Sequence, residues 1–418
     1  MNSQSVSKRD EPPPAPTSGA EEFHIGEEGR YDRLKLIGWW DQTRLRQSRV
    51  LVVGAGALGN EVIKNLALVG VGHLLILDFD RIEASNLSRA VLFRAEHCGQ
   101  SKAVVAAEMA RQMNPDCHLV GRQADVTQDV GLGLIRDMDV VIGCVDNREA
   151  RLWINRMCWK VGTPWVDGGI QEINGVAKTF VPPGGACYEC TMTENDYRLM
   201  HLRYSCPLLK REDIQQGKVP TAPTIAALVG ALQSQEALKI LHGKTVGDGV
   251  GLVFNGDANR FYQTRFPRRE NCLSHETYAQ IVSLDLGAQQ TTVRALLETA
   301  SEKLGFTVDT IELDRDFLLA LACEQCQQLT PVNRPIAQVT LGEGECPQCR
   351  LMRHPKIVCD IGIEDDAAGL PLRQLGIPDY DIVKVKGGAG QAQILLNADA
   401  PSVWGTPASG EDVVLHVG

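Results

Sequence analysis

The sequence predicts an α/β fold: a doubly wound, mostly parallel sheet followed by a smaller C-terminal domain. Two observations predict the sheet. Short apolar runs alternate with segments of helical periodicity, and a glycine-rich turn follows the first run directly. A third observation, two closely spaced cysteine pairs in the last third of the chain, predicts the separate small domain.

The first predicted strand, 48–53, reads Ser-Arg-Val-Leu-Val-Val and runs directly into the glycine-rich turn 54–59. Apolar side chains at helical spacing predict helices at 60–68 and at 102–113, the second capped by Ser101. The same criteria predict further elements: strands at 73–78 and 139–144, a helix from 224 to about 241 ended by Gly243, a helix near 291–297, and a turn and strand within 375–385.

Changes in composition predict the domain bounds. Residues 1–24 contain a proline-rich run and predict a disordered tail. Residues 25–285 form the predicted large domain, and 286–418 form the smaller one. A chain of 418 residues is long enough for both.

Charge and hydropathy exclude several classes of protein. The net charge of −10 argues against a general nucleic-acid binder, which would show a basic surface. No apolar run approaches the roughly 20 residues that span a bilayer, and the first 22 residues lack the apolar centre of a signal peptide. We therefore expect a cytoplasmic protein. In that reducing compartment, closely spaced pairs among the thirteen cysteines bind metal or do chemistry more often than they form disulfides.

The glycine-rich turn predicts a nucleotide site. Gly54, Gly56 and Gly59 allow a tight turn and close approach of the backbone to a phosphate, and the helix that follows offers free N–H groups. Asp78 ends the second predicted strand, 24 residues after Gly54, where a ribose hydroxyl would be held. This pattern alone fits an NAD-dependent oxidoreductase equally well.

Further polar residues at strand ends and helix starts favour phosphate chemistry. Arg89 and Lys102 could stabilise charge on an α-phosphate, and Asp146 could hold Mg²⁺. Taken singly, each is more often an ordinary surface charge. Two cations and an acid in this order, at the carboxyl edge of a parallel sheet, suit phosphates and a metal ion better than a nicotinamide ring.

Residues 30–243 resemble the ubiquitin-activating enzymes and their bacterial ThiF–MoeB-type relatives, which adenylate the sulfur carriers of molybdopterin and thiamine synthesis. The resemblance covers about half of the chain and rests on several motifs in the same order: Arg30-Tyr-Asp-Arg33, the turn 54–59, the run from Asp78 to Arg89, Lys102, and Cys144-Val-Asp-Asn147. At Ala90 the family often has Gln, a departure from which we expect little effect on the chemistry.

The resemblance implies an ATP-dependent adenylyltransferase with a Rossmann-like domain. It implies that Asp78 binds the ribose of ATP and that Asp146 binds Mg²⁺. It assigns the phosphates of ATP to Asn86, Arg89 and Lys102.

The implied reaction is acyl-adenylate formation on a small ubiquitin-like or sulfur-carrier protein. The carboxylate of its C-terminal glycine attacks the α-phosphorus of ATP and expels pyrophosphate. Positioning and charge neutralisation lower the barrier, so no protein nucleophile is required. By the same resemblance, Arg33 would reach into the site of the other subunit of a dimer. A homodimer is the simpler expectation, because adenylating and metal-binding residues share one chain.

The first candidate metal site begins with Cys187 and Cys190, whose spacing suits one metal ion. The resemblance implies a second cysteine pair downstream. The matching residues here are Cys272 and His275, which leave a possible Cys₃His zinc site. The alternative is a vestigial site with His275 as a surface histidine.

The second candidate metal site is a predicted zinc ribbon within 323–349. Its two pairs are Cys323 with Cys326 and Cys346 with Cys349. Four thiolates close the coordination shell, so this zinc would be structural and would help a small domain to fold. A redox dithiol is the alternative, but it does not explain why two pairs occur.

Cys206 is a candidate nucleophile. Arg203, Lys210 and Arg211 lie nearby in the sequence and could lower the pKa of its thiol. The resemblance implies that a cysteine in this region accepts the acyl group as a thioester, although in sulfur-carrier activators it need not do so. The alternative is a packing cysteine. The remaining cysteines lack a basic context and are interpreted as packing residues: Cys98, Cys117, Cys144, Cys158 and Cys359.

The leading hypothesis is an enzyme that adenylates its carrier, forms a thioester on Cys206 and passes the carrier to a conjugating enzyme. It resembles the stand-alone activating enzymes of bacterial ubiquitin-like conjugation systems, some of which serve in antiviral defence. The C-terminal domain could recruit the carrier or the conjugating enzyme. Truncation after Asp285 should then spare exchange of pyrophosphate into ATP but abolish transfer.

Two other hypotheses stay open. In the second, the enzyme stops at adenylation and hands the carboxylate to a sulfur donor; the C-terminal third shows no convincing rhodanese domain, so that donor would be separate. The third is an NAD-dependent oxidoreductase or an inactive scaffold. No nucleic-acid or membrane partner is expected.

Overall fold

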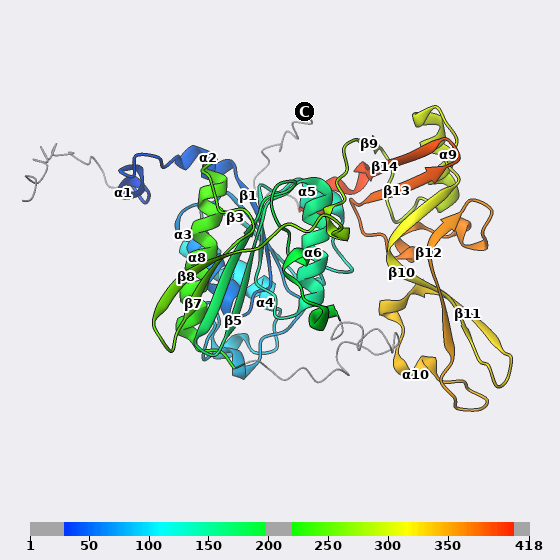
Figure 1. Ribbon diagram of the computed structural model, residues 1–418, viewed down its shortest axis with the longest axis horizontal. Helices are drawn as coiled ribbons and strands as arrows, with labels where there is room; N and C mark the ends of the chain where they lie inside the picture. The colour runs from blue at the N-terminus through cyan, green and yellow to red at the C-terminus, as the bar shows by residue number, and fades with distance from the viewer. Residues whose placement is uncertain (1–28, 198–219, 405–418) are drawn as a thin grey trace, which may run out of the picture. The chain divides into compact units, whose positions relative to one another are not determined.

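The computed structural model describes residues 29–197 and 220–404, and it confirms an α/β fold with a large, mainly parallel sheet (Figure 1). The chain divides into a short compact unit up to Trp40 and a large unit from Asp41. The short unit contains α1 (Asp32–Lys35), in which Asp32 accepts a hydrogen bond from the N–H of Gly29 at 2.6 Å and pairs with Lys35 at 2.8 Å.

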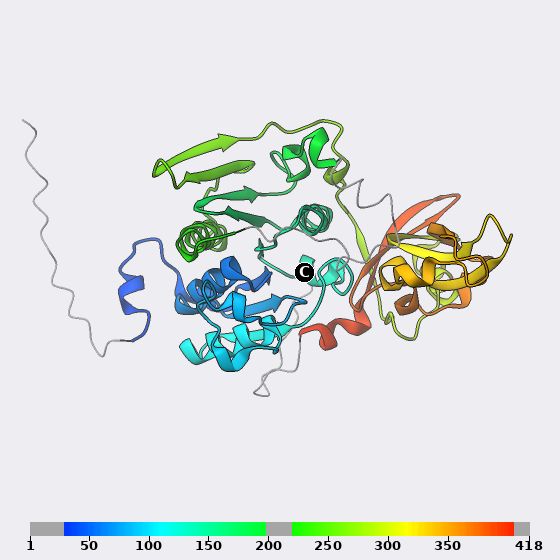
Figure 2. The same ribbon diagram turned by 90° about the horizontal axis from the view of Figure 1, so that it is seen from below.

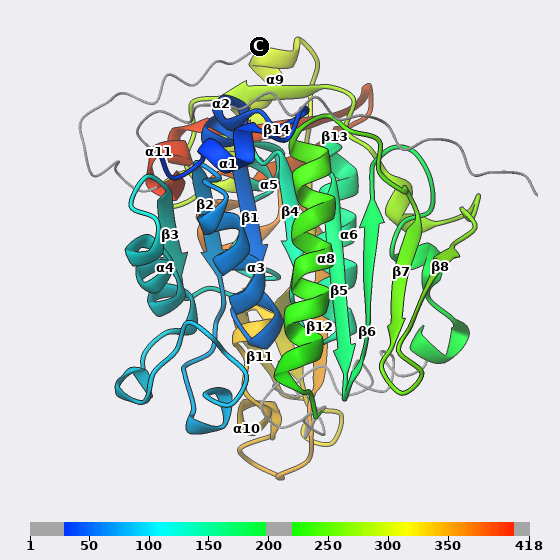
Figure 3. The same cartoon turned by 90° about the vertical axis from the view of Figure 1, so that its left-hand side faces the viewer.

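The large sheet has eight strands in the order β3-β2-β1-β4-β5-β6-β7-β8, which can be followed in Figure 3. Its first five strands are parallel, and β6 to β8 continue it in antiparallel fashion. The strands are β1 (Arg49–Val53), β2 (His73–Leu77), β3 (His118–Arg122), β4 (Val140–Gly143), β5 (Trp165–Gln171), β6 (Asn174–Phe180), β7 (Val250–Asn255) and β8 (Arg260–Arg265).

Helices lie on both faces of this sheet (Figures 2 and 3). They are α2 (Gln42–Gln47), α3 (Ala57–Leu68), α4 (Lys102–Met113), α5 (Leu132–Arg136), α6 (Arg148–Val161) and α8 (Pro223–Leu241). The central strands are almost wholly buried, as parallel strands covered on both faces must be. Their side chains form a core with α5 and α6 in which Trp165 stacks on Phe180 at 5.1 Å between ring centroids.

A second, six-stranded sheet follows, in the order β11-β10-β13-β14-β9 with β12 paired to β10. Its elements are β9 (Ile281–Leu284), α9 (Val293–Leu304), β10 (Thr310–Ala322), β11 (Leu329–Pro335), α10 (Leu341–Gly344), β12 (His354–Gly362), β13 (Ile382–Gly387), β14 (Gly390–Leu396) and α11 (Ala400–Trp404). Leu296, Leu297 and Ala300 of α9 pack with Val385 and Ile394 of the sheet in a core of their own. This sheet takes its first strand from before residue 286, and the domain bounds stay a prediction.

Most predicted elements occur within a few residues of their expected bounds. The helix at 102–113 has the predicted bounds, whereas the helix expected at 60–68 begins three residues earlier, at Ala57. Ser101 stands at the N-cap of α4 as predicted, but the capping bond is absent. Within the described residues, its buried hydroxyl has no hydrogen-bond partner. None of the described helices is long and apolar enough to cross a bilayer.

The turn between β1 and α3 requires glycine at two positions. Gly54 has a φ of +97°, and a Cβ there would lie 2.5 Å from the carbonyl oxygen of Cys144 on the neighbouring strand end. A Cβ on Gly59 would overlap the carbonyl oxygen of Gly54. Gly56 differs, because a Cβ there meets nothing within 4 Å. Close packing of the backbone at Gly54 and Gly59 therefore fixes the conformation of this turn.

We expect Gly59→Ala to lower the free energy of unfolding by about 2–3 kcal/mol, because the added methyl group forces the turn away from α3. Urea denaturation of the nucleotide-free protein measures this. Gly56→Ala is the matched control and should change stability by less than about 1 kcal/mol. Equal stability of the two variants would contradict the packing argument.

Candidate functional site

A cavity of about 1200 Å³ opens where the parallel strands end. Its walls include the ends of β1, β2 and β4 and reach across to β6, β7 and β8. Seven of the residues singled out in the sequence line it: Gly54, Gly56, Asp78, Asn86, Arg89, Lys102 and Asp146. Gly59 supports the turn from behind, and Arg33 belongs to α1 in the short unit.

Asp78 joins the glycine turn to the second strand. It follows β2, and its Oδ2 accepts a hydrogen bond from the N–H of Ala55 at 2.7 Å. Its Oδ1 accepts a bond from the N–H of Asp80 at 2.8 Å. Burial raises the pKa of the Asp78 carboxyl, while Lys102 and the two N–H donors act in the opposite direction. Each carboxylate oxygen keeps one lone pair for a ligand.

The cations predicted to meet phosphates are already in contact with protein oxygens. Lys102, the first residue of α4, pairs with Asp80 at 2.7 Å. Arg89 donates a hydrogen bond to the carbonyl oxygen of Ser85 at 3.1 Å. Asn86 accepts a bond from the N–H of Glu83 at 2.9 Å and so holds its own turn. A bound phosphate would compete with these protein oxygens for Lys102 and Arg89.

Asp146 and Asn147 follow β4 after two intervening residues. The side-chain oxygen of Asn147 accepts a hydrogen bond from the N–H of Ala150 at 2.8 Å, which caps α6. The amide of Asn147 also donates to Asp146 Oδ1 at 3.3 Å. The cap thus holds Asp146 in the wall of the cavity, where its carboxylate could bind a cation.

The wall of the cavity also contains a largely buried ion pair that the sequence did not predict. Arg151 Nε contacts Asp167 Oδ1 at 2.8 Å, and Arg151 also donates to the carbonyl oxygens of Val145 at 2.6 Å and Gly168 at 2.9 Å. Burial opposes the charge of Arg151, but Asp167, Tyr188 and Asp146 together outweigh it and raise the pKa of Arg151. This pair binds the end of β4 to β5, two strands whose contact no local pattern reveals.

A second omission is Lys178 on β6, which also lines the cavity. Its ammonium lies 5.2 Å from the ring centroid of Tyr188 and 5.5 Å from that of Phe266. Burial lowers its pKa, and within the described residues it makes no ion pair with a carboxylate. Lys178 is two residues after Val176, which also lines the cavity, and side chains two apart on a strand share one face. That alternation could have predicted that Lys178 faces the cavity.

The structure brings together the four residues of the first candidate metal site. One ligand atom from each of Cys187, Cys190, Cys272 and His275 lies within 4.8 Å of the others. Sulfur atoms of Cys187 and Cys272 are 3.5 Å apart, and Cys190 Sγ lies 3.4 Å from His275 Nε2. Tetrahedral zinc with Zn–S bonds of about 2.3 Å would set sulfurs roughly 3.8 Å apart. The group can therefore close around one such ion.

The four cysteines of the predicted ribbon also converge. The sulfur atoms of Cys323 and Cys349 are 3.5 Å apart, and those of Cys326 and Cys346 are 4.0 Å apart. All four sulfur atoms lie within 4.8 Å of one another. One pair follows β10 and the other precedes β12, two strands that pair with each other. Sheet pairing thus closes a four-sulfur group that could hold a metal ion.

Cys206 lies outside the described residues. Of the cysteines interpreted as packing residues, Cys117 and Cys158 are buried and Cys144 is half-buried. That interpretation is wrong for Cys98 and Cys359, which are exposed. Cys98 follows a short 3₁₀ turn, and Cys359 lies on a largely exposed stretch of β12, so neither has a core to enter.

The ThiF family model matches residues 29–274. The mouse protein named adenylyltransferase and sulfurtransferase MOCS3 is 29% identical over 381 residues, which cover 90% of this chain and 75% of that protein. The protein of that name from Drosophila persimilis is 30% identical over 250 residues, 58% of this chain but only 52% of its own length. The SAMP-activating enzyme E1 of Haloferax volcanii is 36% identical over 221 residues, which cover 51% of this chain and 75% of that protein.

Among solved structures, the crystal structure of MccB from E. coli with ATP is similar in fold. Its TM-score is 0.50 at 21% identity, with 60% of this chain and 75% of that chain covered. At this level of identity the likeness shows the fold alone.

Proposed function

This chain belongs to the ThiF family, and on that premise we propose that it adenylates the C-terminal glycine carboxylate of a ubiquitin-like or sulfur-carrier protein. The relatives named as an adenylyltransferase and as an activating enzyme support the reaction class. The observation that carries the proposal is the cavity in which the glycine turn, two cations and an acid meet.

The size of the cavity fits a nucleotide together with a peptide tail. Its volume of about 1200 Å³ exceeds the roughly 300–1000 Å³ of a site for one small molecule. One part is lined by Gly54, Asp78 and Lys102, which suit the nucleotide. Another is lined by backbone and apolar groups, including Gly175 and Phe254, which suit an extended chain. The carboxylate and the nucleotide would meet between them.

In this assignment the glycine turn and the start of α3 cradle the phosphates of ATP, and Asp78 holds its ribose. Lys102 and Arg89, with Asn86, bind the phosphates, and Lys102 leaves Asp80 to do so. Asp146 is the proposed ligand of Mg²⁺, which would neutralise charge on the pyrophosphate when bound.

The reaction needs orientation and charge compensation. A carboxylate oxygen of the terminal glycine forms a bond to the α-phosphorus while the bond from that phosphorus to the bridging oxygen breaks. The electron pair leaves with pyrophosphate, whose growing charge the cations stabilise. Arg33 would contribute to this site from the other subunit of a homodimer. Measuring the molecular mass of the protein in solution tests whether it forms that dimer.

We expect Lys102→Glu to reduce exchange of labelled pyrophosphate into ATP by about 10²–10³-fold, because it replaces a phosphate-binding cation with an acid. The assay uses a panel of small carrier proteins that end in Gly-Gly, with ATP and Mg²⁺. Lys303→Glu, a charge reversal on the exposed face of α9, is the control and should exchange normally. Unchanged exchange in Lys102→Glu, or hydride transfer with NAD in place of exchange, would contradict the proposal.

We further propose that both cysteine clusters hold structural zinc. The donor sets, Cys₃His and Cys₄, are complete and leave no open position for a substrate. Zinc in the first cluster would tie Cys187 and Cys190, which follow β6, to Cys272 after β8. Zinc in the second would stabilise a ribbon with a small hydrophobic cluster of its own.

Elemental analysis of the purified protein, after removal of loosely bound metal with a chelator, should give two zinc ions per chain. Cys323→Ser and Cys272→Ser should each lose one ion, because three remaining ligands bind zinc far more weakly. Cys359→Ser is the matched control, an exposed cysteine outside both clusters, and should keep two. A wild-type chain with intact thiols and no zinc would refute the assignment.

The acyl group has two candidate destinations. In the first, the Cys206 thiolate attacks the acyl carbon, a C–S bond forms, the C–O bond to phosphate breaks and AMP leaves. A conjugating enzyme would then receive the carrier, and the C-terminal sheet with its ribbon is the proposed recruiting surface. In the second, a separate sulfur donor attacks the adenylate, as the sulfurtransferase in the name of the mouse relative suggests. Both reactions suit the reducing cytoplasm, where we place the protein.

A DTT-sensitive adduct between chain and carrier, formed with ATP and seen on a non-reducing gel, should disappear in Cys206→Ala. Cys98→Ala and Cys359→Ala are the controls, because these two cysteines are exposed and could react unspecifically. Loss of the adduct in a control variant, with Cys206→Ala unaffected, would reject Cys206. Normal pyrophosphate exchange with no adduct at all would favour the sulfur-carrier reaction.

A further inference from the structure

One wall of the cavity is a loop that also contacts the C-terminal sheet. Residues 123–131 connect β3 to α5, and Ala124, Asp125 and Val126 line the cavity. The loop starts beside the strand-end acid, since the N–H of Ala124 donates to the carbonyl oxygen of Asp78 at 3.3 Å. This part of the wall therefore belongs to the nucleotide end of the cavity.

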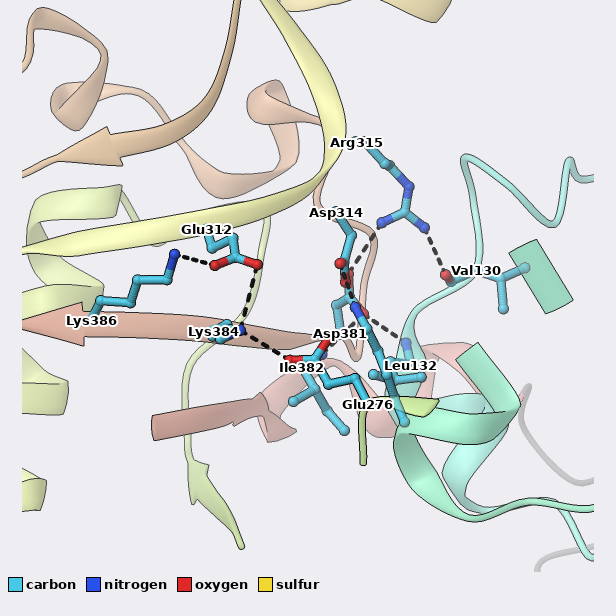
Figure 4. A network of polar contacts seen from close by, with 11 residues as sticks. Val130, Leu132, Glu276, Glu312, Asp314, Arg315, Asp381, Ile382, Lys384 and Lys386 are labelled. Atoms are coloured by element: carbon cyan, nitrogen blue, oxygen red, sulfur yellow. Dashed lines mark hydrogen bonds and ion pairs between the residues drawn. The ribbon is translucent and has the colours of Figure 1, made fainter. Parts of the chain in front are cut away.

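The other side of the loop is held by Arg315 of β10 (Figure 4). Its Nε donates to the carbonyl oxygen of Thr127 at 2.9 Å, and its Nη2 donates to that of Val130 at 3.0 Å. Its Nη1 pairs with Asp381 Oδ2 at 3.4 Å. Asp381 Oδ1 in turn accepts a bond from the N–H of Leu132 at 2.6 Å. Arg315 of β10 thus binds two carbonyls of the loop, and Asp381, the residue before β13, binds the first N–H of α5.

This contact is buried and close. Arg315 and Asp381 are 9% and 6% exposed, and the guanidinium lies 4.8 Å from the ring centroid of Trp153 on α6. A Cβ on Gly131 or Gly133 would come within about 2.5 Å of the carbonyl oxygen of Asp379 or Tyr380, so the two backbones touch. The planar fork of an arginine suits two carbonyls and a carboxylate at once, which an ammonium group cannot match.

The loop transmits the position of Thr127 to the cavity. Asp125 Oδ1 accepts bonds from both the N–H and the hydroxyl of Thr127, each at 2.8 Å. Asp129 Oδ2 accepts a bond from the N–H of Asp125 at 2.8 Å and closes the turn. A shift of the Thr127 carbonyl, the group that Arg315 holds, therefore moves the cavity residue Asp125 as well.

We propose that Arg315 is a positioning residue for nucleotide binding, through which the C-terminal sheet sets the shape of the nucleotide end of the cavity. The proposal rests on the proposed function in one respect, that this cavity binds ATP. It also reverses an expectation drawn from the sequence. Truncation after Asp285 removes both Arg315 and Asp381, so it should impair exchange of pyrophosphate into ATP instead of sparing it.

The test is the affinity of the full-length protein for ATP with Mg²⁺, measured by isothermal titration calorimetry. We expect Arg315→Lys to raise the Kd for ATP, and the KM for ATP in exchange, by about tenfold, the effect of roughly one lost hydrogen bond to a charged group. The kcat at saturating ATP should change less than twofold, because no group that touches the reacting atoms is altered. A double variant, Arg315→Gln with Asp381→Asn, leaves no unpaired buried charge and should show the same rise.

Asp314→Asn is the matched control. Asp314 is the neighbour of Arg315 on β10 and pairs with Lys160 of α6, so it also links β10 to a helix of the first sheet, but within the described residues it forms no hydrogen bond with the loop. It should leave the Kd for ATP unchanged. Hydrogen exchange adds a second readout: ATP should protect amides 124–132 in the unaltered chain and less so in Arg315→Lys.

Equal Kd values for Arg315→Lys and the unaltered chain would overturn the inference and leave the proposed function standing. Equal losses of affinity in Arg315→Lys and Asp314→Asn would also overturn it, because general docking of the sheet would then explain both. Absence of ATP binding by the unaltered chain would overturn the proposed function and this inference together.

Discussion

The carboxylate of Asp78 is the contact on which the geometry of the cavity depends. With one oxygen on the N–H of Ala55 and the other on that of Asp80, it fixes the end of β2 against the glycine turn that follows β1. It thereby sets where α3 begins and where the Asp80–Lys102 pair stands. A half-buried carboxylate that accepts two backbone hydrogen bonds is costly to displace, so Asp78 stabilises this end of the cavity.

Much of this arrangement could be predicted from the sequence, because the signals are local. Apolar runs of the right length predicted strands within a residue or two of their bounds, and helical spacing predicted α4 without error. The glycines at 54 and 59 stand where the backbone excludes a Cβ. Cysteine spacing grouped the four cysteines of the ribbon, because two ligands three residues apart can readily reach one ion, whereas Cys187 and Cys190 were joined to Cys272 and His275 only by the family resemblance.

What could not be predicted depends on contacts between distant segments. Arg315 and Asp381 are 66 residues apart and meet only because β10 and β13 pair. The Arg151–Asp167 pair likewise depends on β4 lying beside β5. Exposure of Cys98 and Cys359 follows from the side of the chain that faces solvent, which a single thiol does not reveal. Ser101 stands at the expected N-cap position, but its side chain makes no capping hydrogen bond. The position of a residue in the sequence therefore does not by itself predict its hydrogen bonds.

The contact between Arg315 of β10 and the 123–131 loop limits how segments of this protein can be exchanged with those of another protein. The parts that must stay together are scattered along the chain: the loop, the middle of β10 and the start of β13. A C-terminal sheet grafted from another protein at a single junction keeps these contacts only if it supplies an arginine for the carbonyls at 127 and 130 and an acid for the N–H at 132. Functional chimeras therefore need crossovers that exchange all three segments together. In this protein the unit that must be exchanged is discontinuous in sequence although its parts are in contact in space.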